Sequence, residues 1–222
     1  MTHDDPPTTL PKREPPTNRH ARATGRRSAS WWTAFILWGA LFATGCHKDT
    51  ALPVLADVPK FAMTDQSGKA FTNDTLRGKV WAAAFVFTRC PSACPRVTKS
   101  MRGVQKDAAA RGVALHLVSF SIDPDNDTPE VLRAYATEYQ ADTKTWSFVT
   151  GDADGVRKVA EQGFKIAVDG TADPQKPSFG IAHGTELVLV DQNEKIRGFY
   201  ASADPQALTS LIDDAARLDD AG

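Results

Sequence analysis

The chain has 222 residues, with 26 basic and 27 acidic side chains and a formal net charge of −1. This near-neutral balance argues against a nucleic-acid-binding protein, which usually shows a strongly basic face, so we expect no nucleic-acid partner. Hydrophobic residues make up 41% of the chain, too many for a disordered protein. The length suits one domain of ordinary size with extensions.

The amino-terminal part of the sequence is predicted to direct the protein to its location rather than to fold. Residues 1–27 are rich in proline, threonine and charge and have no apolar period, which predicts a disordered tail. Residues 28–46 contain the apolar run 31–42, preceded by Arg26 and Arg27. Basic residues before about a dozen apolar ones are typical of a secretory signal, and the run is short for a transmembrane helix, which needs about 20 residues.

Cys46 ends this segment and leaves two interpretations open. Small residues before a cysteine resemble a bacterial lipoprotein cleavage site, in which Cys46 becomes lipidated, although Ala43 stands where leucine is usual. The alternative is an uncleaved signal anchor, and a twin-arginine signal at Arg26-Arg27 is a third, poorer match. Because the basic flank stays inside, the folded domain is expected on the periplasmic side of a bacterial inner membrane, tethered to it. Cys46 is not expected to pair with the other cysteines.

Two long apolar runs dominate the body of the chain, which is placed at residues 53–220 after a linker at 47–52. The runs 79–87 and 113–121 suit strands that are buried on both faces. No element is expected before about residue 58. The expected elements are a hairpin (60–72), a helical turn (73–77), a strand (79–87), a helix (95–111), a strand (113–121), a helix (129–140), a strand (145–150), a helix (152–162), a hairpin (184–200) and a final helix from about 204.

Capping residues set the expected helix ends. Pro95 is predicted at the first position of its helix, where proline costs no hydrogen bond, and Gly112 at the end of the same helix. Thr128 is predicted to cap the next helix, with Pro129 at its first position. The element order matches a thioredoxin-like α/β fold, with a central mixed β-sheet flanked by helices and an N-terminal hairpin extension.

Cys90 and Cys94 stand at the exit of the first buried strand, and each is followed by proline. Ligand sites of α/β sheets lie at the carboxyl ends of strands, and a helix N-terminus stabilises a thiolate. A separation of four residues near a helix start places both sulfur atoms on one face, within disulfide reach. A static disulfide, a redox-active dithiol and a soft-metal site all remain open. The first is disfavoured because so small a closed loop adds little stability.

A metal site needs a third ligand besides the two thiols, which favour copper(I) or zinc. His116 lies within an apolar strand and is predicted to be a packed histidine. His183 follows the irregular stretch 163–182 and precedes the last hairpin. In a thioredoxin-like fold that position faces the dithiol, and thioredoxins have proline there.

Four blocks of this sequence, in the same order, resemble the Sco/SenC family of copper chaperones. The first is Phe87-Thr88-Arg89-Cys90-Pro91-Ser92-Ala93-Cys94-Pro95, which resembles the metal-binding motif of the family. The others are residues 119–130, residues 146–151, and His183 with residues 187–191. Together they cover almost the whole body.

The resemblance implies a membrane-tethered thioredoxin-like domain that binds copper(I), and also copper(II), through Cys90, Cys94 and His183. It implies that Asp123 is an acid just outside this ligand set, although a plain turn residue fits equally well. The implied partners are the copper-site subunit of a haem-copper oxidase such as cytochrome c oxidase, other copper chaperones and thiol reductases. The chain departs from many members at Ser92, Ala93 and Ala182, which replace acidic residues, so we expect altered copper(II) affinity or docking.

Several functions remain open at this stage. The leading hypothesis is a copper metallochaperone, which is not an enzyme. The second is a thiol-disulfide oxidoreductase, in which Cys90 and Cys94 form a redox-active dithiol that acts on cysteines of an oxidase subunit. A copper or redox sensor is a third. A peroxidase is disfavoured because residues 83–85 lack the proline that peroxiredoxins carry before their cysteine.

Overall fold

The computed structural model describes residues 51–166 and 185–220. The tail, the signal segment with Cys46, and His183 lie outside the described residues, so the expectations for them stay predictions. Within the two described ranges, no helix is long and apolar enough to cross a membrane.

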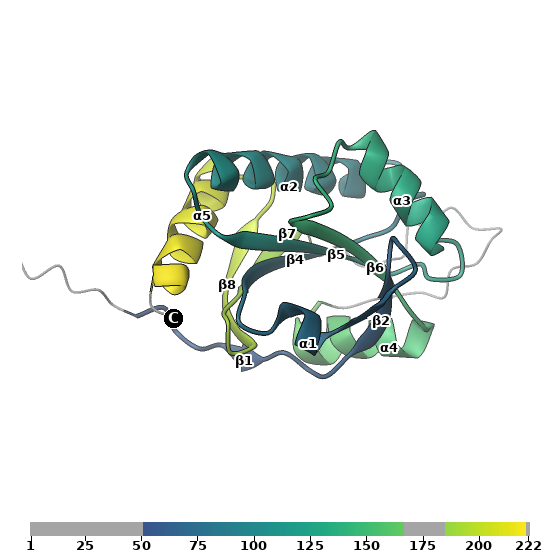
Figure 1. The fold of residues 1–222 in the computed structure, drawn as a ribbon, viewed down its shortest axis with the longest axis horizontal. Coiled ribbons are helices and arrows are strands. Elements are labelled where there is room, and N and C mark those ends of the chain that lie inside the picture. Colours follow the sequence, from purple (N-terminus) through teal and green to yellow (C-terminus); the bar gives the residue numbers. More distant parts are fainter. Residues whose placement is uncertain (1–50, 167–184, 221–222) are drawn as a thin grey trace, which may run out of the picture. The chain divides into compact units, whose positions relative to one another are not determined.

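A single eight-stranded mixed sheet forms the centre of the domain (Figure 1). The strand order is β1-β8-β7-β4-β5-β6-β2-β3; β4, β5 and β6 run parallel, and the other neighbouring pairs are antiparallel. This confirms the predicted thioredoxin-like class, and the predicted hairpin extends the sheet through β2. The strands are β1 (Ala56–Asp57), β2 (Ala62–Asp65), β3 (Ala70–Thr72), β4 (Val80–Val86), β5 (Leu115–Ser121), β6 (Trp146–Thr150), β7 (Glu186–Val190) and β8 (Lys195–Ala201).

Helices cover both faces of the sheet. Figure 1 shows α2, α3 and α5 on one face and α1 and α4 on the other. Their bounds are α1 (Asn73–Leu76), α2 (Ala93–Ala110), α3 (Pro129–Glu138), α4 (Ala153–Lys158), a π-helical turn η1 (Val159–Gly163) and α5 (Pro205–Asp220).

Strand β4 divides the core into two apolar clusters. Its even-numbered residues, Val80 to Val86, pack in the cluster beneath α2, α3 and α5, and its odd-numbered ones, Trp81 to Phe85, pack in the cluster beneath α1 and α4. Every residue of β4 is buried. This is the physical reason for the continuous apolar run, because a strand covered on both faces has no side that requires polar residues.

The residues at the ends of α2 and α3 match the predictions except at the start of α2. Gly112 follows α2 with a φ of +69°, a conformation that glycine adopts without strain. The Thr128 side chain accepts the Val131 N–H at 3.4 Å, and Pro129 is the first residue of α3, as predicted. The prediction for Pro95 was wrong: α2 begins at Ala93, which makes Pro95 its third residue. The first four N–H groups of a helix have no intrahelical partner, so the third position also tolerates proline.

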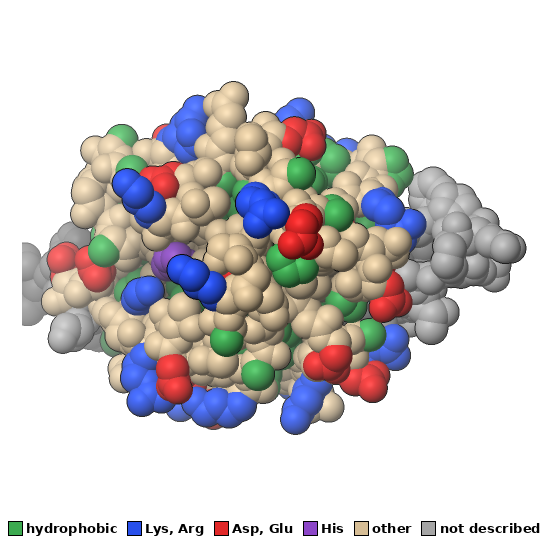
Figure 2. Space-filling model, turned by 45° about the vertical axis from the view of Figure 1, so that its right-hand side comes forward, with side chains coloured by type: hydrophobic (Ala, Val, Ile, Leu, Met, Phe, Trp, Pro, Cys, Tyr) green, Lys and Arg blue, Asp and Glu red, His purple; other side chains and the backbone are tan. Residues whose placement is uncertain are grey.

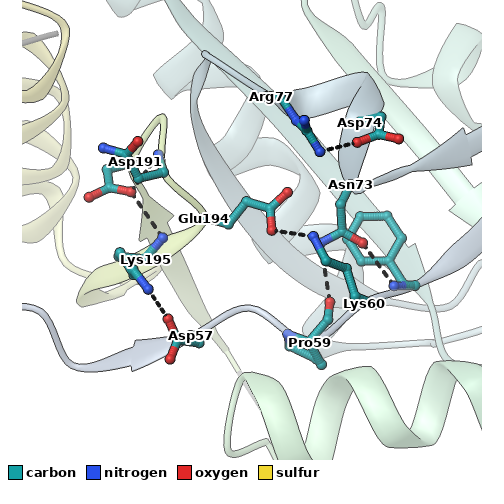
Figure 3. Close-up of polar contacts among 11 residues, drawn as sticks. Asp57, Pro59, Lys60, Asn73, Asp74, Arg77, Asp191, Glu194 and Lys195 are labelled. Atoms are coloured by element: carbon teal, nitrogen blue, oxygen red, sulfur yellow. Dashed lines mark hydrogen bonds and ion pairs between the residues drawn. The ribbon is translucent and has the colours of Figure 1, made fainter.

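Two further expectations need correction. The helix predicted over 152–162 ends as α-helix at Lys158 and widens into η1. The segment before residue 58, expected to hold no element, contains β1, which pairs with β8. Figure 3 shows two ion pairs beside this strand, from Lys195 to Asp57 and from Lys60 to Glu194. A strand of two residues is too short to show an alternation of apolar and polar side chains, so the sequence gives no sign of β1. Its pairing with the distant strand β8 is what makes it a strand.

Acidic and basic side chains are interspersed over the face drawn in Figure 2.

Candidate metal centre

Two neighbouring loops build the site at the carboxyl end of the sheet. The parallel strands β4 and β5 end at Val86 and Ser121, which are paired in register. The N–H of Ile122 donates to the carbonyl oxygen of Val86 at 3.0 Å, so the loops that follow the two strands start side by side. Loop 87–92 leads into α2 and loop 122–128 leads into α3. This is the edge at which α/β folds place their ligands.

Both predicted thiols lie together at the start of α2. Cys90 and Cys94 are free, buried, and 9% and 6% exposed. The Cys94 N–H donates to the Cys90 sulfur at 3.4 Å. The Cys90 N–H donates to the carbonyl oxygen of Phe87 at 3.3 Å, which closes the turn before the helix. The thiols belong to the apolar cluster beneath α2 and α3, which limits their contact with water.

The two thiols differ in acidity. Burial raises the pKa of the Cys90 thiol, but the N–H groups of Cys94, Ser92 and Ala93 outweigh it, so its pKa lies below the ordinary value. Burial raises the pKa of Cys94 to about 12, with further contributions from the Cys90 thiol and the Asp127 carboxylate. Backbone N–H groups at a helix start stabilise the first sulfur as an anion, whereas the second lies deeper.

This difference predicts unequal alkylation. In the reduced domain, iodoacetamide should modify Cys90 first, and the rate should level off at a lower pH than for free cysteine because the thiolate is the nucleophile. Cys94 should react at least about tenfold more slowly, since one pKa unit changes the thiolate fraction tenfold. Peptide mass spectrometry over a pH series measures both rates. In guanidinium chloride the rates should converge; equal rates in the folded domain would contradict the assignment.

Asp123, predicted as an acid near the ligands, is buried and 1% exposed. One carboxylate oxygen accepts from Nε and Nη2 of Arg89 at 3.0 and 2.7 Å, and the other accepts from Nδ2 of Asn126 at 2.8 Å. Asp123 therefore holds the residue immediately before Cys90 and also closes its own loop. Both alternatives, the supporting acid and the turn residue, have contacts in the structure, and its role toward a metal stays a prediction.

Asp127 is a residue of this site that the sequence analysis missed. It is fully buried, and its carboxylate accepts from the N–H and Oγ1 of Thr88 at 3.1 and 2.5 Å and from Oγ of Ser121 at 2.6 Å. Burial, opposed by these hydrogen bonds, raises its pKa above the ordinary value. The only signal in the sequence was an acid directly before the Thr128 cap, and a loop with three aspartates does not show which one points inward.

His116 is a packed histidine, as predicted. It lies near the start of β5, at the opposite end of that strand from the two loops, and its Nε2 lies 3.0 Å from Oγ of Ser147. Burial lowers the pKa of His116 to about 4. In the part of the chain that the structure describes, no group of three or more His, Cys, Asp or Glu side chains is placed to hold a metal ion. The predicted third ligand, His183, lies outside that part.

Comparison with known proteins identifies the family. The SCO1/SenC family profile matches residues 53–217. The chain belongs to the SCO1/SenC family. This confirms the resemblance seen in the four sequence blocks, and it covers all described strands and the dithiol.

Three solved Sco structures are similar to this chain. A SCO1/SenC family lipoprotein from Bacillus anthracis is 37% identical, covers 73% of this chain and 95% of its own, and has a TM-score of 0.67. BsSco, a Sco family cytochrome c oxidase assembly protein with a disulfide switch, is 28% identical over 77% and 98% of the two chains, with a TM-score of 0.68. Bradyrhizobium japonicum ScoI, solved with copper bound, is 21% identical over 73% and 99%, with a TM-score of 0.62, and shows the shared fold.

Proposed function

We propose that this Sco protein carries one copper ion, held by the thiolates of Cys90 and Cys94 and the imidazole of His183. The observation that carries the proposal is the pair of free, buried thiols at one helix start. Two thiolates in an apolar surrounding are the soft ligands that copper(I) prefers. The copper-bound ScoI structure supports the same choice of metal.

The proposed task of the protein is delivery. Copper passes by ligand exchange to the copper-site subunit of a haem-copper oxidase, and copper chaperones or thiol reductases load or reduce the dithiol. The association of BsSco with cytochrome c oxidase assembly supports this client. The protein works on the periplasmic side of the inner membrane, tethered by lipidated Cys46 or by an uncleaved signal. The Bacillus anthracis lipoprotein supports such a tether.

Copper(I) titration of the reduced domain tests the ligand set. In competition with a chelator, we expect one tightly bound copper per chain. His183→Ala should bind copper(I) at least about tenfold more weakly. Losing a contact that only supports a ligand already lowers metal affinity about 10- to 100-fold, and losing the ligand itself should cost no less. His116→Gln is the matched control, because it removes an imidazole that we assign to packing, and its affinity should not change. Unchanged affinity of His183→Ala would remove His183 from the ligand set.

A thiol-disulfide oxidoreductase is the second candidate. The unequal thiols favour it, because Cys90 can attack as a thiolate while the more buried Cys94 resolves the mixed disulfide. The disulfide switch of BsSco also supports it. A mildly oxidising dithiol potential with reductase activity and no stable copper complex would decide for this function over the first.

A further inference from the structure

The two residues before Cys90 are each held by a different aspartate. Arg89 forms an ion pair with Asp123 at 2.7 Å, and Thr88 donates its N–H and hydroxyl to Asp127. The turn that presents the dithiol is thus fixed to loop 122–128, after β5, at two successive positions. Ser121, the last residue of β5, completes the Asp127 site with a third donor at 2.6 Å.

The charges of these aspartates are compensated differently. The guanidinium of Arg89 neutralises Asp123, which leaves that pair with no net charge. Among the described residues, the donors to Asp127 are two hydroxyls and one backbone N–H, all of them neutral. As a carboxylate, Asp127 places a negative charge in a buried position, where charges interact more strongly than in water. The carboxylate lies beside the dithiol turn, because it accepts from Thr88, two residues before Cys90, and because the loops after β4 and β5 start side by side.

Copper binding changes the charge next to this carboxylate. If the proposed function is correct, each of the two thiols releases one proton when copper(I) binds, so two thiolates surround one monovalent cation. The centre then carries one net negative charge, with a neutral imidazole as the third ligand. With copper(II) the same ligands give a neutral centre. A buried anion nearby opposes the first complex and leaves the second almost unaffected.

We propose that Asp127 is a positioning residue for copper release, which fixes the dithiol turn through Thr88 and weakens the hold on copper(I) through its negative charge. The inference rests on the proposed copper function. Its consequence is a carrier that binds copper(I) through two strong ligands and still gives it up to a partner.

Asp127→Asn tests the charge while it preserves the shape, because the amide oxygen can still accept from Thr88. We expect copper(I) affinity to rise about tenfold, because a like charge beside the buried dithiol turn is removed, with copper(II) affinity unchanged. Thr88→Val keeps the carboxylate but removes one donor, so copper(I) affinity should fall while copper(II) affinity does not. Asp125→Asn, an exposed acid in the same loop, is the control and should change neither affinity.

A purely structural role predicts a different result: Asp127→Asn and Thr88→Val would then both bind copper(I) and copper(II) more weakly. That result, or an Asp127→Asn affinity equal to the wild type, overturns the proposal. Thermal unfolding shows whether each variant is folded. If Asp127→Asn does not fold, the copper affinities of Thr88→Val and the wild type test the proposal alone. If the wild type binds no copper, the proposed function fails. Alkylation of Cys94 at pH 8 then tests Asp127: Asp127→Asn should raise the rate several-fold, because removing a nearby negative charge raises the thiolate fraction, and an unchanged rate contradicts its charge effect.

Discussion

Cys94→Ser should abolish tight copper(I) binding while the domain stays folded. The hydroxyl of serine is not ionised at neutral pH and is a hard donor, so the centre loses one of its two soft anionic ligands. Loss of a supporting contact around a metal already costs 10- to 100-fold in affinity, so loss of a ligand should exceed about 100-fold. The stability cost is that of a buried hydroxyl, about 1–3 kcal/mol, below the roughly 5–15 kcal/mol that a domain has.

Chelator competition with the reduced domain measures the effect, and circular dichroism shows that the variant is folded. His116→Gln is again the control, because His116 packs near the opposite end of β5 and its loss should leave copper(I) affinity unchanged. If Cys94→Ser kept wild-type affinity, the two thiols would not be a joint binding site.

The same variant also separates the two candidate functions. Cys90 remains in Cys94→Ser and can still attack a disulfide, but it has no neighbouring thiol to resolve the product. An oxidoreductase variant of this kind accumulates a mixed disulfide with its substrate, which non-reducing electrophoresis detects. A copper carrier variant instead loses delivery without trapping a partner. The outcome shows which chemistry the dithiol performs for its client.

The sheet and the dithiol were predictable because they depend on local pattern. Residues 79–87 are apolar throughout because β4 is covered on both faces, and the abrupt change at Cys90 and Cys94 marks the carboxyl end of that strand. Parallel neighbours then fix where the loop after Ser121 must lie. Local pattern therefore predicts both the fold class and the edge of the sheet that holds the thiols.

The roles of the acids in loop 122–128 were not predictable from the pattern. Asp123, Asp125 and Asp127 occupy every second position of the loop and look alike in the sequence. In the structure the first and the last are buried, whereas the middle one is exposed. Their orientation depends on partners more than thirty residues away, Arg89 for Asp123 and Thr88 for Asp127. A turn without a repeating period gives no rule for which side chain points inward, so Asp127 emerged only from the three-dimensional contacts.

The segment before β2 was missed for a similar reason. Its order depends on Arg197 of β8, whose Nε donates to the carbonyl oxygen of Pro53 at 3.1 Å and whose Nη2 donates to that of Leu52. Sequence neighbours do not reveal a partner about 145 residues away. This arginine therefore joins the start of the domain, where the proposed tether ends, to the last hairpin.

Arg197→Leu should destabilise the domain more than any other single change at an ion pair considered in this structure. Nη1 of Arg197 lies 2.6 Å from Oδ2 of Asp191, and the two side chains are only 13% and 4% exposed. The other oxygen of Asp191 accepts the N–H groups of Asn193 and Lys195, both at 2.9 Å, which form the turn between β7 and β8. Leucine would leave a buried carboxylate without its cation, at a cost of about 3–5 kcal/mol.

Urea unfolding of the soluble domain measures this cost against a matched exposed pair. Lys195→Met breaks the ion pair to Asp57, in which the two side chains are 40% and 76% exposed, and should change the unfolding free energy far less than Arg197→Leu does. Asp191→Asn combined with Arg197→Leu should recover part of the loss, because no charge then stays buried alone. Equal effects of Arg197→Leu and Lys195→Met would mean that Asp191 finds water as readily as Asp57, and the start of the domain would then not depend on Arg197.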